Sequence, residues 1–247
     1  MAIVVFVGAV ASGKTTMARI LKSVAEKRGY VVKYVDININ HGFAYLLTCL
    51  LVTLLSYKYV GNYYLTLKFN NQKLFCRYLW LLQLLDIFYM PIKYLSSIKL
   101  FIKWNKFFHQ KYLLIIDEYY LNAIADYMYF TKFFCNCCCR NTFRKEVYKL
   151  FYNLALRVLL NSFKQEKTLI VYLRRSLLES IRGWMIREKT KIVDVKHITF
   201  RDVPTRALID TLKQYFTTNV SYEEHFIKDL NESLKGMLRR WFLTSQY

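Results

Sequence analysis

The feature of this sequence that most constrains its fold is a glycine-containing loop near the N-terminus. Residues 8–15 read Gly-Ala-Val-Ala-Ser-Gly-Lys-Thr and match the pattern G-x-x-x-x-G-K-[ST] in full. The run 3–7 before the loop is apolar and β-branched, which predicts a strand buried on both faces. The segment 15–28 after the loop carries apolar residues at helical spacing. This order predicts an α/β fold with three layers and a central parallel sheet.

The residue types in this loop explain how it would hold a nucleoside triphosphate. Glycines let the backbone curl, so that its N–H groups point inward at phosphate oxygens, and the helix N-terminus adds partial positive charge. We expect Lys14 to reach the β- and γ-phosphates and the Thr15 hydroxyl to ligate Mg²⁺. The sequence thus predicts ATP and Mg²⁺ as ligands, with a nucleotide-binding set of Gly8, Ala11, Ser12, Gly13, Lys14, Thr15 and Thr16.

A buried strand that ends in an acid is predicted at 111–117. Its end reads Leu-Leu-Ile-Ile-Asp-Glu, which has the form of a Walker B strand, so we expect Asp117 to hold Mg²⁺, through water. Glu118 has two interpretations that the sequence leaves open. It either polarises a water for ATP hydrolysis or is a structural acid paired with an arginine.

Asp36 is a candidate to position or deprotonate a phosphoryl acceptor. It ends the strand predicted at 31–37, and the carboxyl ends of parallel strands face the ligand crevice. A turn or capping acid is the alternative. The polar residues that follow it are candidates for further contacts: Asn38, Asn40 and His41.

A basic segment follows the strand predicted at 168–173. Arg182 and Arg187 fall within the helix predicted at 177–187, and their guanidinium groups are candidates to neutralise charge on a transferring phosphoryl group. A solvated basic helix is the alternative. Further helices are predicted at 121–134, 144–163, 205–216 and 222–241.

Residues 42–110 differ from the rest of the chain. They hold eight Lys/Arg and a single acid, Asp86, among many Leu, Tyr, Phe and Trp. The uncharged run 43–57 is shorter than the roughly 20 apolar residues of a membrane-spanning helix. We predict a single domain spanning 1–247, in which 42–110 is a hydrophobic, basic, helical insertion. Three interpretations of this insertion stay open: buried helices over the sheet, a surface that lies on a membrane or a partner, or a membrane-spanning helix.

Charge and cysteine content bear on partners and compartment. The formal charge of +20 favours binding to polyanions, namely nucleotides, nucleic acid or an anionic membrane surface. A homodimer is also left open. Four of the six cysteines crowd into 135–139, which suits no disulfide framework. We therefore expect free, partly buried thiols and a cytoplasmic, reducing setting, with membrane association as an addition.

Together these motifs resemble the thymidylate kinase and deoxynucleoside kinase group of P-loop kinases. The likeness rests on the opening 6–21, on Asp-Glu-Tyr at 117–119, on Ala-Asp-Tyr at 125–127, on Val-Tyr-Leu at 171–173 before the basic helix, and on Tyr-Glu-Glu at 222–224, similar to the start of the family's last helix. The resemblance implies Mg²⁺- and ATP-dependent phosphoryl transfer to a nucleotide or nucleoside, with Lys14, Asp36, Glu118, Arg182 and Arg187 as catalytic candidates.

The sequence departs from this group at several positions. Val10 and Ala11 stand where an acid and a glycine are common, and Glu118 replaces the arginine of the Asp-Arg-Tyr motif. The resemblance therefore implies the fold without implying thymidylate as substrate. The alternative function is a P-loop ATPase in which Glu118 activates water and the basic, aromatic insertion binds a membrane surface or nucleic acid.

Overall fold

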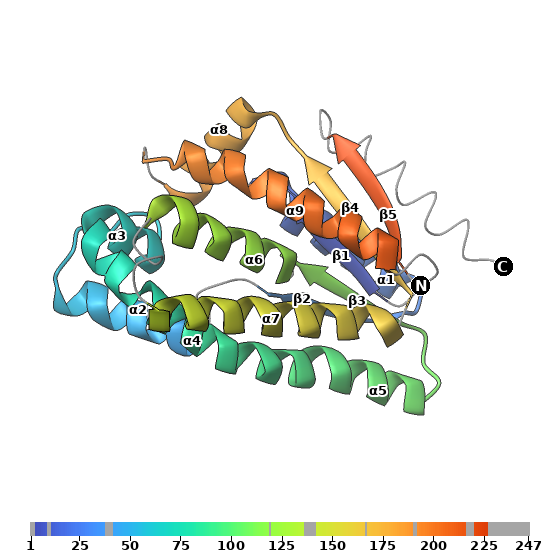
Figure 1. Cartoon of the computed structure of the whole chain (residues 1–247). Helices are drawn as coiled ribbons and strands as arrows, with labels where there is room; N and C mark the ends of the chain where they lie inside the picture. Colours follow the sequence, from blue (N-terminus) through green and yellow to red (C-terminus); the bar gives the residue numbers. More distant parts are fainter. Residues whose placement is uncertain are drawn as a thin grey trace.

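A five-stranded, all-parallel sheet forms the centre of the molecule (Figure 1). The structure, a computed structural model, describes residues 3–8, 11–37, 42–118, 120–135, 142–165, 167–189, 192–215 and 220–226. The strands lie in the order β2-β3-β1-β4-β5. Their bounds are β1 Ile3–Gly8, β2 Val31–Asp36, β3 Tyr112–Asp117, β4 Thr168–Arg174 and β5 Val220–Phe226. The predicted α/β fold with a central parallel sheet is confirmed.

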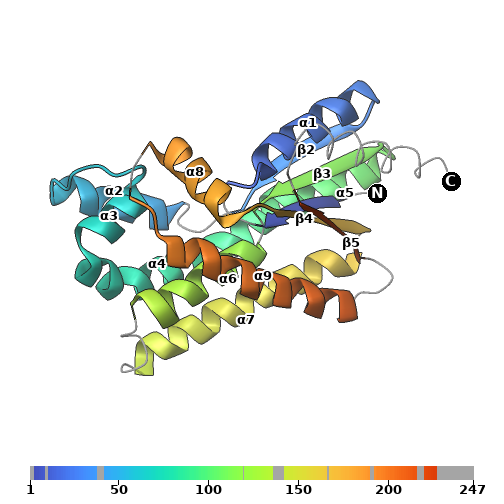
Figure 2. The same ribbon diagram turned by 90° about the horizontal axis from the view of Figure 1, so that it is seen from above.

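The sheet is buried on both faces because successive side chains of a strand point to opposite sides. Val4 and Phe6 of β1 pack with Met17 of α1 (Lys14–Lys27). Val5 and Val7 belong to the larger core on the other side, which the remaining helices cover. Figure 2 shows α1 on one side of the sheet and three helices on the other, α6 (Tyr120–Tyr129), α7 (Thr142–Gln165) and α9 (Val195–Tyr215).

The segment between β2 and β3 is helical, as predicted. It forms α2 (Phe43–Leu54), α3 (Tyr63–Asn70), α4 (Gln72–Lys93), the π-helical turn η1 (Tyr94–Lys99) and α5 (Leu100–Phe107). Here α4 packs along α7, and α5 reaches β3. Within the described ranges, no helix is both long and apolar enough to cross a bilayer.

The prediction of a helix at 222–241 is wrong at its start. Tyr222, Glu223 and Glu224 lie in β5, which pairs in parallel with β4, and residues from 227 on lie outside the described part of the chain. Two adjacent glutamates favour a helix, but β5 is the last strand of the described sheet, and an edge strand tolerates charge. Glu224 also gains partners there, because Arg174 of β4 lies 3.1 Å from it.

The expectation of free thiols is wrong for two cysteines. Cys76 in α4 and Cys135, directly after the π-helical η2 (Phe130–Phe134), form a disulfide although they lie 59 residues apart. Packing of α4 beside η2 brings their Cα atoms to 5.3 Å, within the usual disulfide range. Cys49 is free, and Cys137, Cys138 and Cys139 lie outside the described residues.

Candidate active site

The glycine loop joins β1 to α1 at the carboxyl edge of the sheet. Gly8 has a φ of +129°, and a Cβ there would lie 2.2 Å from the Leu173 carbonyl oxygen of β4, so no other residue fits. The loop closes at Gly13, which also has a positive φ, and α1 begins at Lys14. A cavity of about 710 Å³ opens over the helix N-terminus and is lined by Ala11, Ser12, Gly13, Lys14, Thr15 and Thr16.

The two residues predicted to hold Mg²⁺ lie in contact. The Thr15 hydroxyl donates to Asp117 Oδ2 at 2.6 Å, and the Tyr34 hydroxyl donates to the same oxygen at 2.8 Å. Asp117 Oδ1 is buried and has no hydrogen-bond partner within the described part of the chain. A carboxylate oxygen left unsatisfied beside a hydroxyl and a phosphate loop is a hard oxygen donor set, and it fits Mg²⁺.

Glu118 joins the loop lysine to α9. Its Oε1 lies 3.2 Å from Lys14 Nζ, and its Oε2 lies 3.3 Å from Nη2 of Arg201. Burial alone would raise the pKa of Glu118, but Arg201 and Lys14 outweigh burial and hold this pKa well below its usual range. The backbone of Glu118 is left-handed, with a φ of +51°, a strained conformation that is characteristic of functional sites. Glu118 is therefore paired with an arginine, Arg201.

Asp36 stands at the same edge of the sheet. The register of β2 and β3 pairs it directly with Asp117, and its Oδ1 is buried without a hydrogen-bond partner from any residue that the structure describes. Burial, followed by the nearby negative charges of Glu118 and Asp117, raises the pKa of Asp36 to about 6. A carboxylate with this pKa can accept a proton near neutral pH more readily than an ordinary aspartate.

The predicted arginines lie on α8 (Leu177–Glu188), which packs over the phosphate loop. Arg182 and Arg187 both line the cavity above the loop. Arg175, just before the helix, donates from Nη1 to the Ala11 carbonyl oxygen at 2.6 Å. Helix α8 therefore brings positive charge to the side of the cavity opposite the α1 N-terminus.

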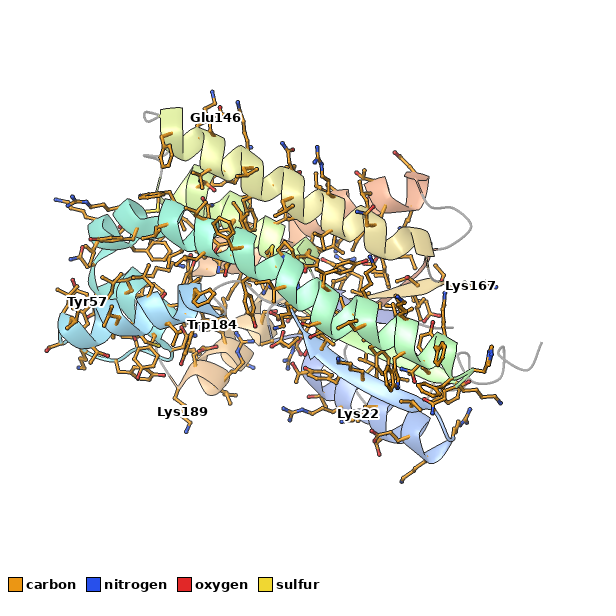
Figure 3. The ribbon with its side chains drawn as sticks, turned by 90° about the horizontal axis from the view of Figure 1, so that it is seen from below. Lys22, Tyr57, Glu146, Lys167, Trp184 and Lys189 are labelled. Carbon is orange, nitrogen blue, oxygen red and sulfur yellow. A yellow bond between two sulfur atoms is a disulfide. The ribbon has the colours of Figure 1, made fainter. Side chains whose placement is uncertain are left out.

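A second cavity of about 460 Å³ adjoins the first, and Glu118 and Arg187 line both. Its walls come from the insertion, from α6, from α8 and from α9; Figure 3 labels Trp184, the aromatic residue that α8 contributes. Its lining is aromatic and charged, with Tyr45, Tyr64, Phe130, Trp184, Asp126, Glu188, His197 and Arg201 among its residues.

Asp126 is the centre of a buried polar network in this second cavity. Its Oδ1 lies 2.7 Å from His197 Nε2 and 3.1 Å from Arg201 Nε. Burial lowers the pKa of His197 despite the attraction of Asp126, so the imidazole is neutral near pH 7. Three buried polar atoms in the lining have no hydrogen-bond partner among the described residues: His197 Nδ1, the Tyr64 hydroxyl oxygen and Trp184 Nε1.

The structure brings together most of the residues singled out in the sequence. One edge of the sheet holds the described loop residues together with Asp36, Asp117, Glu118, Arg182 and Arg187. Three further candidates lie outside the described residues: Asn38, Asn40 and His41. Sequence reasoning missed His197 and Arg201. Their spacing of four residues, which places both on one face of a helix, was the available signal.

No family model and no curated protein sequence matches the chain. Its fold is nevertheless that of the P-loop nucleotide kinases. The chain is similar to thymidylate kinase from Candida albicans, with 13% identity, a TM-score of 0.54, and 98% of this chain and 92% of the other covered. It is also similar to deoxyadenosine kinase from M. mycoides with bound dCTP, with 15% identity, a TM-score of 0.57 and coverage of 98% and 99%. The predicted resemblance is confirmed at the level of the fold.

Proposed function

We propose that this protein transfers the γ-phosphoryl group of ATP to a hydroxyl of a nucleoside. The observation that carries the proposal is the junction of two cavities at Glu118 and Arg187. One cavity lies over a phosphate loop, and the other is lined by aromatic rings and buried polar groups. Such a junction suits a triphosphate and a flat, polar acceptor that meet end to end.

The phosphate side supplies positive charge from two elements. The α1 N-terminus and Lys14 approach the cavity from the loop, and Arg182 and Arg187 approach it from α8. These groups would hold the β- and γ-phosphates and stabilise charge that develops during transfer. Thr15 and Asp117 would hold Mg²⁺, which when bound neutralises charge on the phosphate oxygens.

The charge of the second cavity favours an acceptor without a phosphate group. Three acids line it, Glu118, Asp126 and Glu188, against two arginines, Arg187 and Arg201. Arg201 already forms ion pairs with Glu118 and Asp126. Because a nucleoside monophosphate brings about two negative charges, this lining would hold a neutral nucleoside at a lower electrostatic cost.

Asp36 is the base that a hydroxyl acceptor needs. Its carboxylate would take the hydroxyl proton while the hydroxyl oxygen forms a bond to the γ-phosphorus. The bond from the γ-phosphorus to its bridging oxygen breaks, and ADP leaves. A phosphate acceptor is already ionised near neutral pH and needs no such base.

The contacts of Glu118 speak against the alternative, an ATPase in which Glu118 activates water. Both of its oxygens face cations, Lys14 and Arg201, and its lowered pKa makes it a weak base. We therefore assign Glu118 a positioning role. It orients Lys14 on the phosphate side and Arg201 on the acceptor side.

The proposal is tested by incubating the protein with Mg²⁺ and ATP and either nucleosides or nucleoside monophosphates, then separating the products by chromatography. We expect new nucleoside monophosphate from at least one nucleoside, and none from the Lys14→Ala variant. Diphosphate formation from monophosphates alone would contradict the nucleoside assignment. Acceptor-independent phosphate release that Glu118→Gln abolishes would support the ATPase instead.

A further inference from the structure

Helices α4 and α5, joined by η1, form the long helix at the bottom of Figure 1. This helix carries a row of exposed apolar side chains. The row, called the α4–α5 stripe, consists of Phe88, Ile92, Leu95, Leu100, Trp104 and Phe107, each between 49% and 76% exposed. At a rise of about 1.5 Å per residue, the stripe is roughly 30 Å long. Six large apolar side chains in one row exceed the scattered exposure that is normal for a protein surface.

The π-helical turn η1 places these residues on one face. Phe88, Ile92 and Leu95 are spaced i, i+4 and i+7, and Leu100, Trp104 and Phe107 repeat that spacing. In an unbroken α-helix, the 12-residue step from Phe88 to Leu100 would turn the second triplet about 120° away. A π-helical segment accommodates about one extra residue, so the step becomes equivalent to about 11 residues, or three full turns.

The charge around the stripe has one sign. Residues 72–111 hold seven Lys/Arg and one acid, Asp86, which is buried. Lys99, Lys103 and Lys106 are exposed on the same stretch of helix as the second triplet. Figure 3, which looks at the molecule from below, shows this helix running across the near side with side chains projecting from it.

We propose that the α4–α5 stripe lies on an anionic lipid bilayer, with the helix axis parallel to the surface. Apolar residues that include Trp and Phe, flanked by lysines, are the pattern of helices that insert one face at the headgroup boundary. Lysines would meet anionic headgroups, and the apolar side chains would enter the acyl boundary. Neither contact depends on the phosphoryl-transfer site.

A second copy of this chain fits the stripe less well. Two stripes packed together would bring the exposed Lys99, Lys103 and Lys106 of one copy near those of the other, with no exposed acid in 72–111 to offset them. A nucleic acid would satisfy the lysines, and its bases could stack on Trp104 or Phe107, but it offers no aliphatic surface to Ile92, Leu95 and Leu100. The lipid surface matches both the charge and the whole apolar row.

Vesicle flotation tests this proposal. We expect the full chain to float at low salt with vesicles of phosphatidylcholine and phosphatidylglycerol, and to stay behind with phosphatidylcholine alone. Trp104→Ser combined with Phe107→Ser should weaken binding at least about tenfold, because two large apolar side chains no longer reach the acyl boundary. Each of Lys103→Gln and Lys106→Gln should weaken it about fivefold.

Matched controls lie on α7. Leu150→Ser removes an exposed apolar side chain and Lys145→Gln an exposed charge, and neither should change flotation. Protein that stays behind with anionic vesicles, or floats equally in the Trp104→Ser, Phe107→Ser variant, would overturn the proposal. A dimer in sedimentation that the same variant dissociates would overturn it too, since the stripe would then bind a second copy.

Discussion

Asp36 and Asp117 lie opposite each other on neighbouring strands, yet their surroundings suit different roles. Asp117 accepts hydrogen bonds from Thr15 and Tyr34, which orient its carboxylate toward the phosphate loop. Asp36 has a buried oxygen that no described residue hydrogen-bonds, and its pKa is raised to about 6. This difference between single residues is the reason that we propose Asp117 as a metal ligand and Asp36 as a general base.

We expect Asp36→Asn to lower kcat for phosphoryl transfer at least about a hundredfold, because the variant cannot take the hydroxyl proton. The KM for ATP should stay within about twofold, since the asparagine keeps the shape of the site. In the wild type the rate should fall as the pH drops below about 6, where Asp36 becomes protonated. Steady-state kinetics against pH measures both effects, with the exposed Asp210→Asn as control. An unchanged kcat would exclude Asp36 as the base.

A second residue-scale prediction concerns Lys68, whose ammonium is buried among aromatic rings. It lies 2.5 Å from Asp194 Oδ2 and within 4.8 Å of the ring centres of Phe130 and Phe134. Burial alone would raise the pKa of Asp194, but Lys68 outweighs it and the pKa is lowered. An aspartate whose pKa is lowered in the folded state stabilises the fold fully at pH values above 3.8, its ordinary pKa. This stabilisation is lost as the pH falls through the lowered pKa.

Asp194→Asn should therefore cost about 3 kcal/mol of unfolding free energy at pH 7, because it leaves the Lys68 charge buried without its partner. As the pH falls from 3.8 through the lowered pKa, the difference between variant and wild type should shrink, because Asp194 binds a proton first in the unfolded chain and then in the folded one. Urea unfolding at several pH values measures this. A difference that stays constant with pH would contradict the ion pair.

At the scale of elements, α8 is held against the phosphate loop by a close approach at Gly183. A Cβ at Gly183 would lie 2.7 Å from the Cβ of Ala11 and 3.3 Å from Arg175 Nη1. Ala11 stands where the kinases that the sequence resembles commonly have glycine, and the glycine at 183 leaves space for its methyl group. The orientation of α8 in turn sets where Arg182 and Arg187 lie over the cavity.

We expect Gly183→Ala to push α8 away from the loop. The substitution should destabilise the transition state of the proposed phosphoryl transfer more than it destabilises the fold. The ratio kcat/KM for ATP should fall at least about tenfold, since a shift of about 1 Å in positioning groups is costly. The unfolding midpoint should change little, because alanine favours a helix over glycine. Leu178→Ala, on the exposed side of α8, is the control. Equal kcat/KM in both variants would contradict this role of Gly183.

At the scale of the whole molecule, the insertion and the body of the fold are joined by packing and by one covalent link. The α4 helix packs along α7, and the disulfide fixes Cys76 in α4 to Cys135 at the end of η2. Cys76 directly follows Phe75, whose ring centre lies 5.1 Å from that of Tyr64 in the lining of the second cavity. The disulfide therefore restrains a helix that packs against this cavity.

Cys76→Ser should lower the unfolding free energy by about 4 kcal/mol, the chain-entropy value for a closed loop of 59 residues. Reductant should destabilise the wild type by a similar amount and leave the variant unchanged. Thermal unfolding with and without reductant measures both, and Cys49→Ser is the control because Cys49 is free. If reductant acts equally on wild type and variant, this disulfide does not stabilise the fold.

The parts of the fold that local pattern dictates were predictable. β1, the loop and α1 follow from a continuous apolar run, two glycines and helical spacing, all within the first 28 residues. The helix predicted at 205–216 begins ten residues earlier in the structure, and β5 replaced a predicted helix. Pairing with β4 decided β5, and such pairing has no local signal when a strand carries adjacent acids.

The phosphate loop of the candidate site could be predicted from the sequence, because a short motif, with Gly8, Gly13, Lys14 and Thr15, encodes its backbone shape. The lining of the second cavity could not be predicted, because it forms only when distant segments pack together. The polar residues of this lining come from elements more than 130 residues apart: Tyr64, Asp126, His197 and Arg201. Taken singly, each of them is an ordinary residue in its own segment. Their roles arise from burial and mutual charge, which exist only once the insertion and α9 pack around α6.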